Sequence, residues 1–233
     1  MNTEAIRGAP SWHIHPDAEA LTRHLARAIV RMADAAITAR GAFHLVLAGG
    51  NTPRAVYAAL VSGGRRWDAW HLYHGDERCL PPQNLQRNSR MAESVWLQHV
   101  PIPRAQIHDI PAEMGAEAAA ATYATILPPQ RFDLVLLGIG EDGHTASLFP
   151  GQQWGLDPTT PAVLAVHNAP KAPAERVSLS AWRLQQSREI FFIATGSGKR
   201  DALAAWRRGE EIPAARVGVG ATVWLDAAAW PET

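Results

Sequence analysis

The sequence contains a single cysteine, Cys79, in 233 residues. One cysteine can form neither an internal disulfide nor a cysteine-built metal site, and such scarcity is typical of a reducing compartment. An excess of charge is also missing, because 22 Lys and Arg balance 22 Asp and Glu. Without a global field to attract nucleic acid or an anionic membrane, any recognition of charge has to be local.

Long apolar segments are missing as well. Nowhere do about 18 uncharged apolar residues follow one another, and residues 1–17 lack the apolar core of a signal peptide. His13 and His15, which we interpret as surface or strand residues, have no acidic or cysteine ligand set nearby, and the tryptophans are not interleaved with basic residues. We therefore expect a soluble, cytoplasmic protein that uses no metal and binds neither membrane nor nucleic acid.

Short apolar runs alternate with amphipathic segments along the chain. Apolar residues recur at steps of three or four from Asp17 to Arg40, which predicts a helix that Gly41 ends. Further helices are expected from Pro53 onward, at residues 89–98, 111–127 and 198–208, and briefly after residue 180. The short apolar runs predict strands at residues 43–48, 70–75, 106–110, 132–137, 162–166, 176–180, 189–195 and 221–225.

This alternation predicts the fold class. Strands and helices in turn form a mostly parallel sheet covered on both faces, so we expect an α/β protein with a Rossmann-like, doubly wound sheet. No internal repeat, low-complexity tract or charged linker divides the chain, and residues 1–233 are predicted to form a single domain. Ligands bind at the carboxyl ends of the strands in such sheets, so the residues that follow the predicted strands are the candidates for a site.

The first candidate follows the strand at 43–48 and consists of Gly49, Gly50, Asn51 and Thr52. The glycines allow a tight turn, Thr52 stands where a helix cap is expected, and Pro53 suits the first helical position. Free backbone N–H groups at a helix start, together with the helix dipole, make a site for an anion such as phosphate. An ordinary turn with a capped helix is the alternative.

The second candidate lies at the end of the strand at 70–75. Its residues are Asp76, Glu77 and Arg78, and after them Arg87, Asn88 and Ser89 in a long loop. Charged groups at the point where a buried strand emerges need partners. Either they pair with one another, or Asp76 and Arg78 face a ligand that has both hydroxyls and negative charge.

The third candidate is Lys199, which begins a helix after a strand and a glycine turn. A P-loop would need glycine in place of Ile193 and serine or threonine in place of Arg200, so an NTPase is not expected. A single lysine at a helix start suits one phosphate group, and a solvated surface lysine is the alternative.

The fourth candidate is the stretch LLGIGEDGHTASLFPG, residues 136–151, whose first glycines match G-x-G-x-x-G. A dinucleotide-binding turn needs a helix and a second strand after the glycines. Pro150 and Gly151 break any such helix, so NAD is not expected. The stretch instead places Asp142 and His144 together at a strand end, where a histidine beside a carboxylate can act as a general base.

Four blocks of the sequence resemble the 6-phosphogluconolactonases, a family within the glucosamine/galactosamine-6-phosphate isomerase superfamily. They are LAGGNTPRAVY, GDERCLPPQNLQRNS, LLGIGEDGHTASLFPG and RVSLS…FFIATGSGKRDAL, in the order expected for that family. The resemblance implies hydrolysis of 6-phospho-D-glucono-1,5-lactone to 6-phospho-D-gluconate in the oxidative pentose phosphate pathway, with no metal or cofactor. The expected ligand is therefore a sugar-phosphate lactone, bound by a monomer or a small homo-oligomer.

The resemblance also implies roles for individual residues. His144 would activate water, and Asp142 and Asp76 would orient water or sugar hydroxyls. Asn51 stands where the family more often has serine, and it can still offer polar contacts. The residues expected to bind the substrate, chiefly its phosphate end, are Gly49, Gly50, Asn51, Thr52, Arg78, Arg87 and Lys199.

The chemistry of the reaction agrees with these residues. A δ-lactone is a reactive ester, so a positioned base, a water molecule and donors for the oxyanion are sufficient. A covalent nucleophile is not required. Ser147 lies nearby but lacks the G-x-S-x-G elbow that would indicate one.

Two other functions fit parts of the sequence. Glucosamine-6-phosphate deaminases have a similar D-G-H block, usually continued by I-A-F-N-E-P, and their catalytic glutamate falls on Phe149 here. A phenyl ring cannot transfer the proton that opens the sugar ring. A non-catalytic sugar-phosphate sensor would need a DNA-binding module, and about 16 residues before the first helix cannot form a helix-turn-helix.

Overall fold

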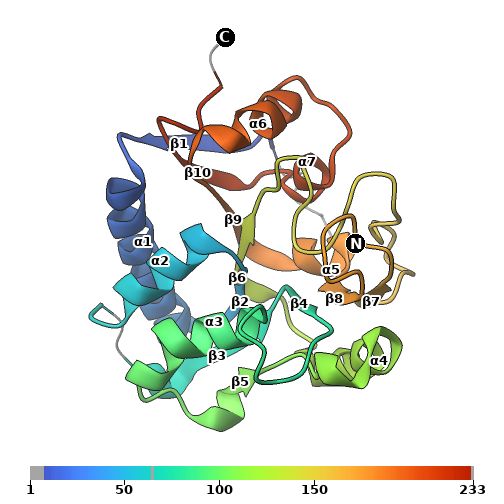
Figure 1. Cartoon of the computed structure of the whole chain (residues 1–233). Coiled ribbons are helices and arrows are strands. Elements are labelled where there is room, and N and C mark those ends of the chain that lie inside the picture. The colour runs from blue at the N-terminus through green and yellow to red at the C-terminus, as the bar shows by residue number, and fades with distance from the viewer. Residues whose placement is uncertain (1–7, 64–65, 232–233) are drawn as a thin grey trace, which may run out of the picture.

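The computed structural model describes residues 8–63 and 66–231, and its centre is a seven-stranded sheet (Figure 1). The strand order is β1-β10-β9-β6-β2-β3-β5, and all neighbours in it run parallel. In that order the strands are Ser11–His15, Thr222–Asp226, Ser187–Ala194, Phe132–Gly138, Phe43–Leu47, Trp70–His74 and Ile107–His108. The predicted α/β fold with a mostly parallel sheet is confirmed.

Helices cover both faces of this sheet. Helices α1, α2 and α3 pack on one face and α4, α5, α6 and α7 on the other. Their bounds, in chain order, are Ala18–Arg40, Asn51–Leu60, Asn88–Val95, Ala116–Ile126, Ala181–Gln185, Arg200–Arg207 and Pro213–Val217. Leu134 and Leu136 of β6 contact the first group of helices, and Val135 and Leu137 contact the second. Because the central strands are buried on both faces, their sequences are continuous apolar runs.

The helix starts differ from the prediction in one place that concerns the site. Helix α1 begins after Asp17, whose Oδ1 accepts a hydrogen bond from the backbone of Ala20, and ends at Gly41, as predicted. Helix α2 begins at Asn51, before Pro53, and its N-cap is Gly50. The interpretation of Thr52 as the cap is therefore wrong, since Thr52 already lies in the first turn.

A second sheet, which the sequence does not predict, lies beside the first. It is antiparallel, with the order β4-β8-β7, and these strands are Asp76–Arg78, Arg176–Leu179 and Val163–Val166. The chain passes from β3 into β4 at Gly75, whose N–H donates to Leu47 O at 2.9 Å and whose carbonyl accepts from Leu179 N at 2.8 Å. Strands expected in the main sheet thus form a separate layer next to its carboxyl edge.

Smaller differences concern three other elements. The sequence does not predict strand β1 or the short helix α7. Helix α4 begins later than expected because Gly115, with φ of 85°, separates it from a 3₁₀ turn at Ala112–Met114. None of the helices in the described ranges is both long and apolar enough to cross a membrane.

The chain leaves β2 and β6 in opposite directions. From β2 it continues to β3 and β5 on one side of the sheet, and from β6 the next strand of the sheet is β9 on the other side. Adjacent parallel strands whose connections diverge leave a crevice at their carboxyl ends, where ligands bind. The last residues of these two strands are Leu47 and Gly138.

Three histidines stack across the neighbouring strands β2, β3 and β5. The ring centroids of His44 and His71 are 4.8 Å apart and those of His71 and His108 are 5.9 Å apart, with the rings nearly parallel. Burial and the neighbouring His71 lower the pKa of His44 to about 4, although Asp133 acts in the opposite direction. Burial also lowers the pKa of His71 and of His108. The stack is therefore uncharged in the folded protein near neutral pH.

The histidine stack should make the fold sensitive to acid. Above pH 6.5 His44 is neutral in both the folded and the unfolded protein. Between pH 6.5 and about 4 the unfolded chain binds a proton at His44 that the folded chain does not, so the free energy of unfolding decreases as the pH is lowered. The variant His44→Gln should show a smaller dependence of the free energy of unfolding on pH. The difference from the wild type should be less than about 1.4 kcal/mol per pH unit, because the ring is partly exposed. Urea unfolding at pH 7 and pH 5 measures the slope, and equal slopes in both proteins would contradict the assignment.

Candidate active site

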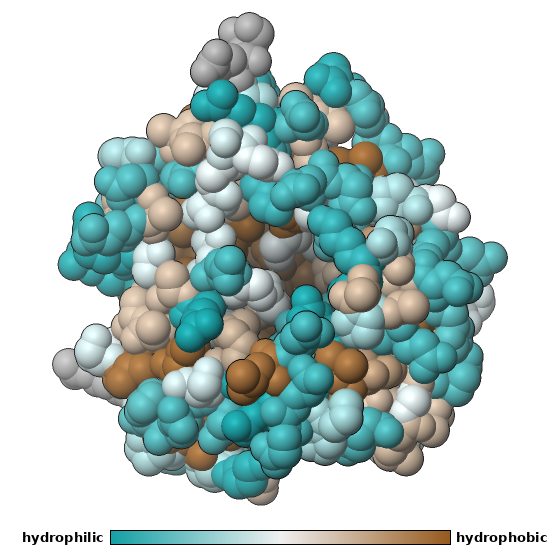
Figure 2. All heavy atoms as spheres, viewed as in Figure 1, coloured by the Kyte–Doolittle hydropathy of each residue, from teal (hydrophilic) through white to brown (hydrophobic). Residues whose placement is uncertain are grey.

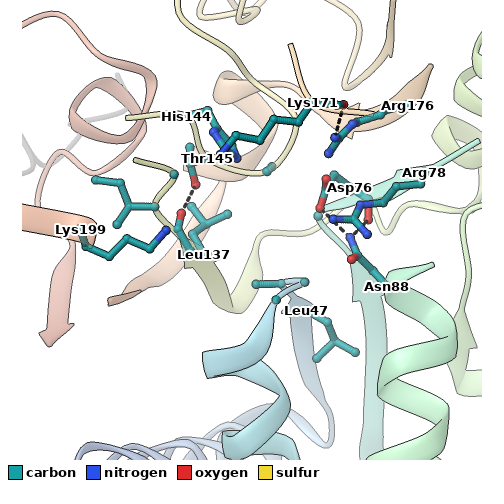
Figure 3. Close-up of a pocket in the computed structure, with 18 residues that line it drawn as sticks. Leu47, Asp76, Arg78, Asn88, Leu137, His144, Thr145, Lys171, Arg176 and Lys199 are labelled. Carbon is teal, nitrogen blue, oxygen red and sulfur yellow. Dashed lines mark hydrogen bonds between the residues drawn. The ribbon is translucent and has the colours of Figure 1, made fainter. Parts of the chain in front are cut away.

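A pocket of about 210 Å³ lies at the carboxyl ends of β2 and β6 (Figure 3). Its floor comes from the main sheet, and the second sheet forms one side through β4 and β8. Figure 2 shows this face of the molecule hollowed near its centre, with hydrophilic residues around the opening. The polar side chains that line the pocket are Asp76, Arg78, Asn88, His144, Thr145, Lys171, Arg176 and Lys199.

The pocket brings together most of the candidates from the sequence. Those that line it are Gly49, Gly50, Asp76, Arg78, His144 and Lys199. Asp142 does not line the pocket but contacts His144. Asn51, Thr52 and Arg87 are not among the lining residues.

His144 and Asp142 form a hydrogen-bonded pair. His144 Nδ1 lies 2.5 Å from Asp142 Oδ1, which also accepts the His144 backbone N–H at 3.2 Å. Burial alone would raise the pKa of Asp142, but the hydrogen bond and charge of His144 outweigh it and lower that pKa. An ionised Asp142 that accepts from Nδ1–H leaves the lone pair on Nε2 of His144, and this tautomer is assigned from the hydrogen bond. The pair therefore presents a basic nitrogen.

Gly140 is required for this pair because the imidazole packs directly on its α-carbon. A Cβ atom at position 140 would lie 2.0 Å from His144 Nδ1 and 2.5 Å from Asp142 Oδ1. The same turn is closed by a hydrogen bond from Gly140 N to His144 O at 2.8 Å and by one from Gly143 N to Gly140 O at 3.0 Å. The middle glycine of G-x-G-x-x-G thus makes room for a histidine and not for a dinucleotide.

The start of helix α2 contributes backbone to the pocket. Gly50 has φ of 107°, a left-handed value that favours glycine, and no side chain caps the helix. The first backbone bond of the helix runs from Arg54 N to Gly50 O, so the N–H groups before it have no partner within the helix. Together with the helix dipole they suit an anion at this end of the pocket. The residues of this turn that line the pocket are Gly49 and Gly50.

Lys199 lies next to this helix start. Thr52 Oγ1 and Thr195 Oγ1 are 2.7 Å apart, which ties the first turn of α2 to the end of β9. Lys199 follows in the 3₁₀ turn Ser197–Lys199 before α6, and Figure 3 shows its side chain pointing into the pocket. A lysine and a helix start at one end of the pocket have the charge and the donors that suit a single phosphate group.

Asp76 is held by two neutral donors. Its Oδ1 accepts from Asn88 Nδ2 at 3.0 Å and its Oδ2 accepts from Ser147 Oγ at 2.6 Å. Asn88 reaches this position only because residue 49 is glycine: a Cβ there would lie 2.0 Å from Asn88 Oδ1. Asn88, which belongs to the second candidate but has no role assigned from the sequence, therefore links the β2 loop to the carboxylate.

Neither Ser147 nor Cys79 is placed to act as a covalent nucleophile. The Ser147 hydroxyl is 1% exposed and donates to Asp76. Burial, followed by the nearby carboxylates, raises the pKa of Cys79 to about 11, which keeps the thiol protonated. Neither residue lines the pocket.

Arg87, which is expected to contact the substrate, instead forms contacts within the protein. Its guanidinium donates to Glu113 Oε2 at 2.8 Å and to Ile110 O at 2.8 Å, and it lies 3.6 Å from the buried carboxylate of Glu77. Glu77 also accepts the backbone N–H of Asn88 at 2.7 Å, at the start of α3. Arg87 thus points away from the pocket and anchors the loop between β4 and α3.

Lys171 and Arg176 complete the set of cationic side chains in the pocket. Arg176 is the first residue of β8, and Lys171 lies in the loop before it. In the sequence PKAPAERVSLS the two charges flank a proline-containing loop, a signal that by itself indicates exposed surface. Only the antiparallel pairing of β8 with β4 brings them to the edge of the main sheet.

The fold and the pocket define an α/β protein with a cationic pocket beside a histidine–aspartate pair. The family of glucosamine-6-phosphate isomerases/6-phosphogluconolactonase matches residues 16–224, and the chain belongs to this family. The resemblance seen in its sequence blocks is therefore confirmed.

Relatives and solved structures agree with this assignment. The 6-phosphogluconolactonase of Mycobacterium tuberculosis is 37% identical over 241 residues, which cover 94% of this chain and 97% of the relative. The structure of 6-phosphogluconolactonase from Thermotoga maritima superposes with a TM-score of 0.84 at 26% identity, covering 93% and 99% of the two chains. A monomeric glucosamine-6-phosphate deaminase, 18% identical over 94% of this chain and 98% of its own, shares the fold with a TM-score of 0.79.

Replacing Gly140 by alanine should break the hydrogen bond between His144 and Asp142, because the added methyl group occupies the position of the ring. The proton on Nδ1 then exchanges with water, so its downfield resonance in a ¹H NMR spectrum should disappear. Gly138→Ala is the matched control, since its Cβ meets nothing within 4 Å. Persistence of the resonance in Gly140→Ala would show that the turn adapts and that Gly140 is not required.

Proposed function

We propose that the chain hydrolyses 6-phospho-D-glucono-1,5-lactone to 6-phospho-D-gluconate in the oxidative pentose phosphate pathway. The observation that carries the proposal is the basic face of His144 in a pocket whose other side chains include four cations, Arg78, Lys171, Arg176 and Lys199. Membership of the family and the 6-phosphogluconolactonases among its relatives support it. The proposed enzyme is a carboxylic-ester hydrolase that needs no metal or cofactor.

In the proposed reaction His144 is the general base. Its Nε2 accepts a proton from a water molecule, which attacks the lactone carbonyl carbon C1. Asp142 keeps the ring in the required tautomer and stabilises the imidazolium that forms, as a carboxylate does beside a catalytic histidine. The tetrahedral intermediate collapses when the bond from C1 to the ring oxygen breaks and Nε2–H returns the proton to that oxygen. Water is consumed and no covalent enzyme intermediate forms.

The rest of the pocket binds the substrate in this proposal. The start of α2 and Lys199 hold the phosphate group, where backbone N–H groups, the helix dipole and an ammonium act on one anion. Asp76 is buried but retains lone pairs besides those that accept from Asn88 and Ser147. Its carboxylate therefore suits a sugar hydroxyl or the attacking water. Arg78 lies beside it on β4.

Deamination of glucosamine 6-phosphate is the alternative, and the site disfavours it. The position where deaminases carry their catalytic glutamate is Phe149, which is fully buried and lies with its ring 4.7 Å from that of His144. Phe149 has no proton to exchange with a substrate. Its ring instead supports the imidazole.

Residues 1–233 act as one catalytic domain in this proposal. We place it in the cytoplasm, as a monomer or small homo-oligomer whose partner is its sugar-phosphate lactone and neither a nucleic acid nor a membrane. The balanced net charge supports the absence of nucleic-acid and membrane partners, since it provides no general attraction to polyanions.

Purified protein should accelerate the loss of freshly prepared 6-phosphogluconolactone well above its spontaneous hydrolysis. The acid released is measured at constant pH, and heat-denatured protein gives the background rate. Ammonia release from glucosamine 6-phosphate, assayed in parallel, should stay at background because Phe149 replaces the required carboxylate. A decay unchanged by the protein would refute the proposal, and ammonia release would support the alternative.

His144→Gln should lower kcat by about 10²–10⁴-fold, the usual range for loss of a general base, with a small change in KM. Asp142→Asn should also lower kcat, because the amide no longer stabilises the imidazolium. Steady-state kinetics at pH 7 on both variants test this. A large rise in KM with kcat unchanged would indicate that His144 only binds the substrate.

A further inference from the structure

The loop that carries Lys171 is held by a buried arginine. Residues 167–175 join β7 to β8 and are here called the strap; Ala169 N donates to Ala174 O at 2.9 Å across it. Arg176, only 5% exposed, donates from Nη2 to Lys171 O at 2.7 Å and from Nε to Pro173 O at 3.1 Å. The backbone at Lys171 is therefore fixed by a charged group that the protein has taken out of water.

The strap and the catalytic histidine rest on the same aromatic ring. Phe149 contacts the His144 ring at a centroid distance of 4.7 Å, and the guanidinium carbon of Arg176 lies 5.4 Å from the Phe149 centroid. Figure 3 shows the Lys171 side chain running from the strap toward His144. Since Phe149 and Arg176 are both buried, the position of Lys171 relative to the base is set by packed groups.

The Lys171 ammonium is available to a ligand. In residues 8–63 and 66–231 it makes no ion pair, and the nearby Glu175 faces His167 at 3.6 Å. The other lysine of the pocket, Lys199, lies in the turn before α6, and the Thr52–Thr195 hydrogen bond joins the end of β9 to the first turn of α2. The pocket therefore has one lysine near the helix start and one near the base.

We propose that Lys171 is a catalytic residue that stabilises the oxyanion of the lactone, and that Arg176 is the positioning residue that holds it beside His144. This inference rests on the proposed hydrolysis of a sugar-phosphate lactone. A cation placed where negative charge develops stabilises the transition state more than the ground state. Lys171 lies on the side of the pocket where this charge develops, next to the base.

The step balances as follows. Water oxygen forms a bond to C1, its proton goes to His144 Nε2, and the carbonyl π electrons become the lone pair of an oxyanion that lies against the Lys171 ammonium. The ammonium keeps its protons throughout. When the electrons return to form the carbonyl, the bond from C1 to the ring oxygen breaks and that oxygen takes the proton from Nε2. The product carboxyl group then ionises to solvent.

Lys171→Met tests the proposal with two substrates. We expect kcat to fall about 100-fold, the effect of removing one oxyanion donor, with little change in KM. The same fall is expected on 6-phosphogluconolactone and on unphosphorylated glucono-1,5-lactone, because the carbonyl is common to both. Lys199→Met should instead raise KM, and only for the phosphorylated lactone. Lys171→Arg should restore part of kcat.

Arg176→Met should lower kcat toward the value of Lys171→Met. In the double variant it should cause little further loss of kcat, because Arg176 acts through the Lys171 ammonium. Glu175→Gln is the control on the strap, since its side chain does not line the pocket, and it should keep kcat and KM. Circular dichroism and Tm verify that the variants fold.

Two results would overturn the inference. If Lys171→Met keeps kcat on the phosphorylated lactone, Lys171 does not act on the oxyanion. If its loss appears only in KM, and only with the phosphorylated lactone, Lys171 binds phosphate. Failure of the wild-type protein to hydrolyse the lactone is a separate outcome that refutes the proposed function itself.

Discussion

The site depends on the parallel pairing of β2 with β6. These strands are neighbours in the sheet, with Leu45 opposite Leu134 and Val46 opposite Val135, yet the chain departs from them in opposite directions. No connection between these two strands therefore covers their carboxyl ends. The start of α2 and the D-G-H turn meet there. The other parts of the site, β4, β8 and the turn before α6, are arranged around this crevice.

Two glycines convert this crevice into a site by letting side chains approach the backbone. Gly49 admits Asn88, and Gly140 admits the pair of His144 and Asp142; in both places an added Cβ would lie 2.0 Å from a side-chain atom. The polar groups so packed are matched by hydrogen bonds, as buried polar groups require. Gly49 and Gly140 thus determine geometry through the volume they leave free, whereas Gly50 and Gly143 do so through a positive φ.

The sequence predicts the main sheet and part of the site because both follow local patterns. Strands such as β6 are apolar runs, and the positions after them carry Gly50, Asp76, His144 and Lys199 into the pocket. The second sheet is not predicted, since β4 is three charged residues without an apolar period and its partner β8 lies far along the chain. The sequence pattern also does not predict which of two adjacent residues at the start of α3 lines the pocket. Successive helical side chains point about 100° apart. Asn88 therefore enters the pocket while Arg87 turns away from it.

The ring of Phe149 also bears on how the activities of this family are separated. It lies between the imidazole of His144 and the guanidinium of Arg176. A glutamate at this position would remove the support of the imidazole, and its carboxylate would pair with Arg176, which would keep it ionised and turned from the sugar. A lactonase scaffold of this kind therefore does not become a deaminase by that substitution alone. Position 149 is thus coupled through Arg176 to the strap, whose backbone that arginine holds.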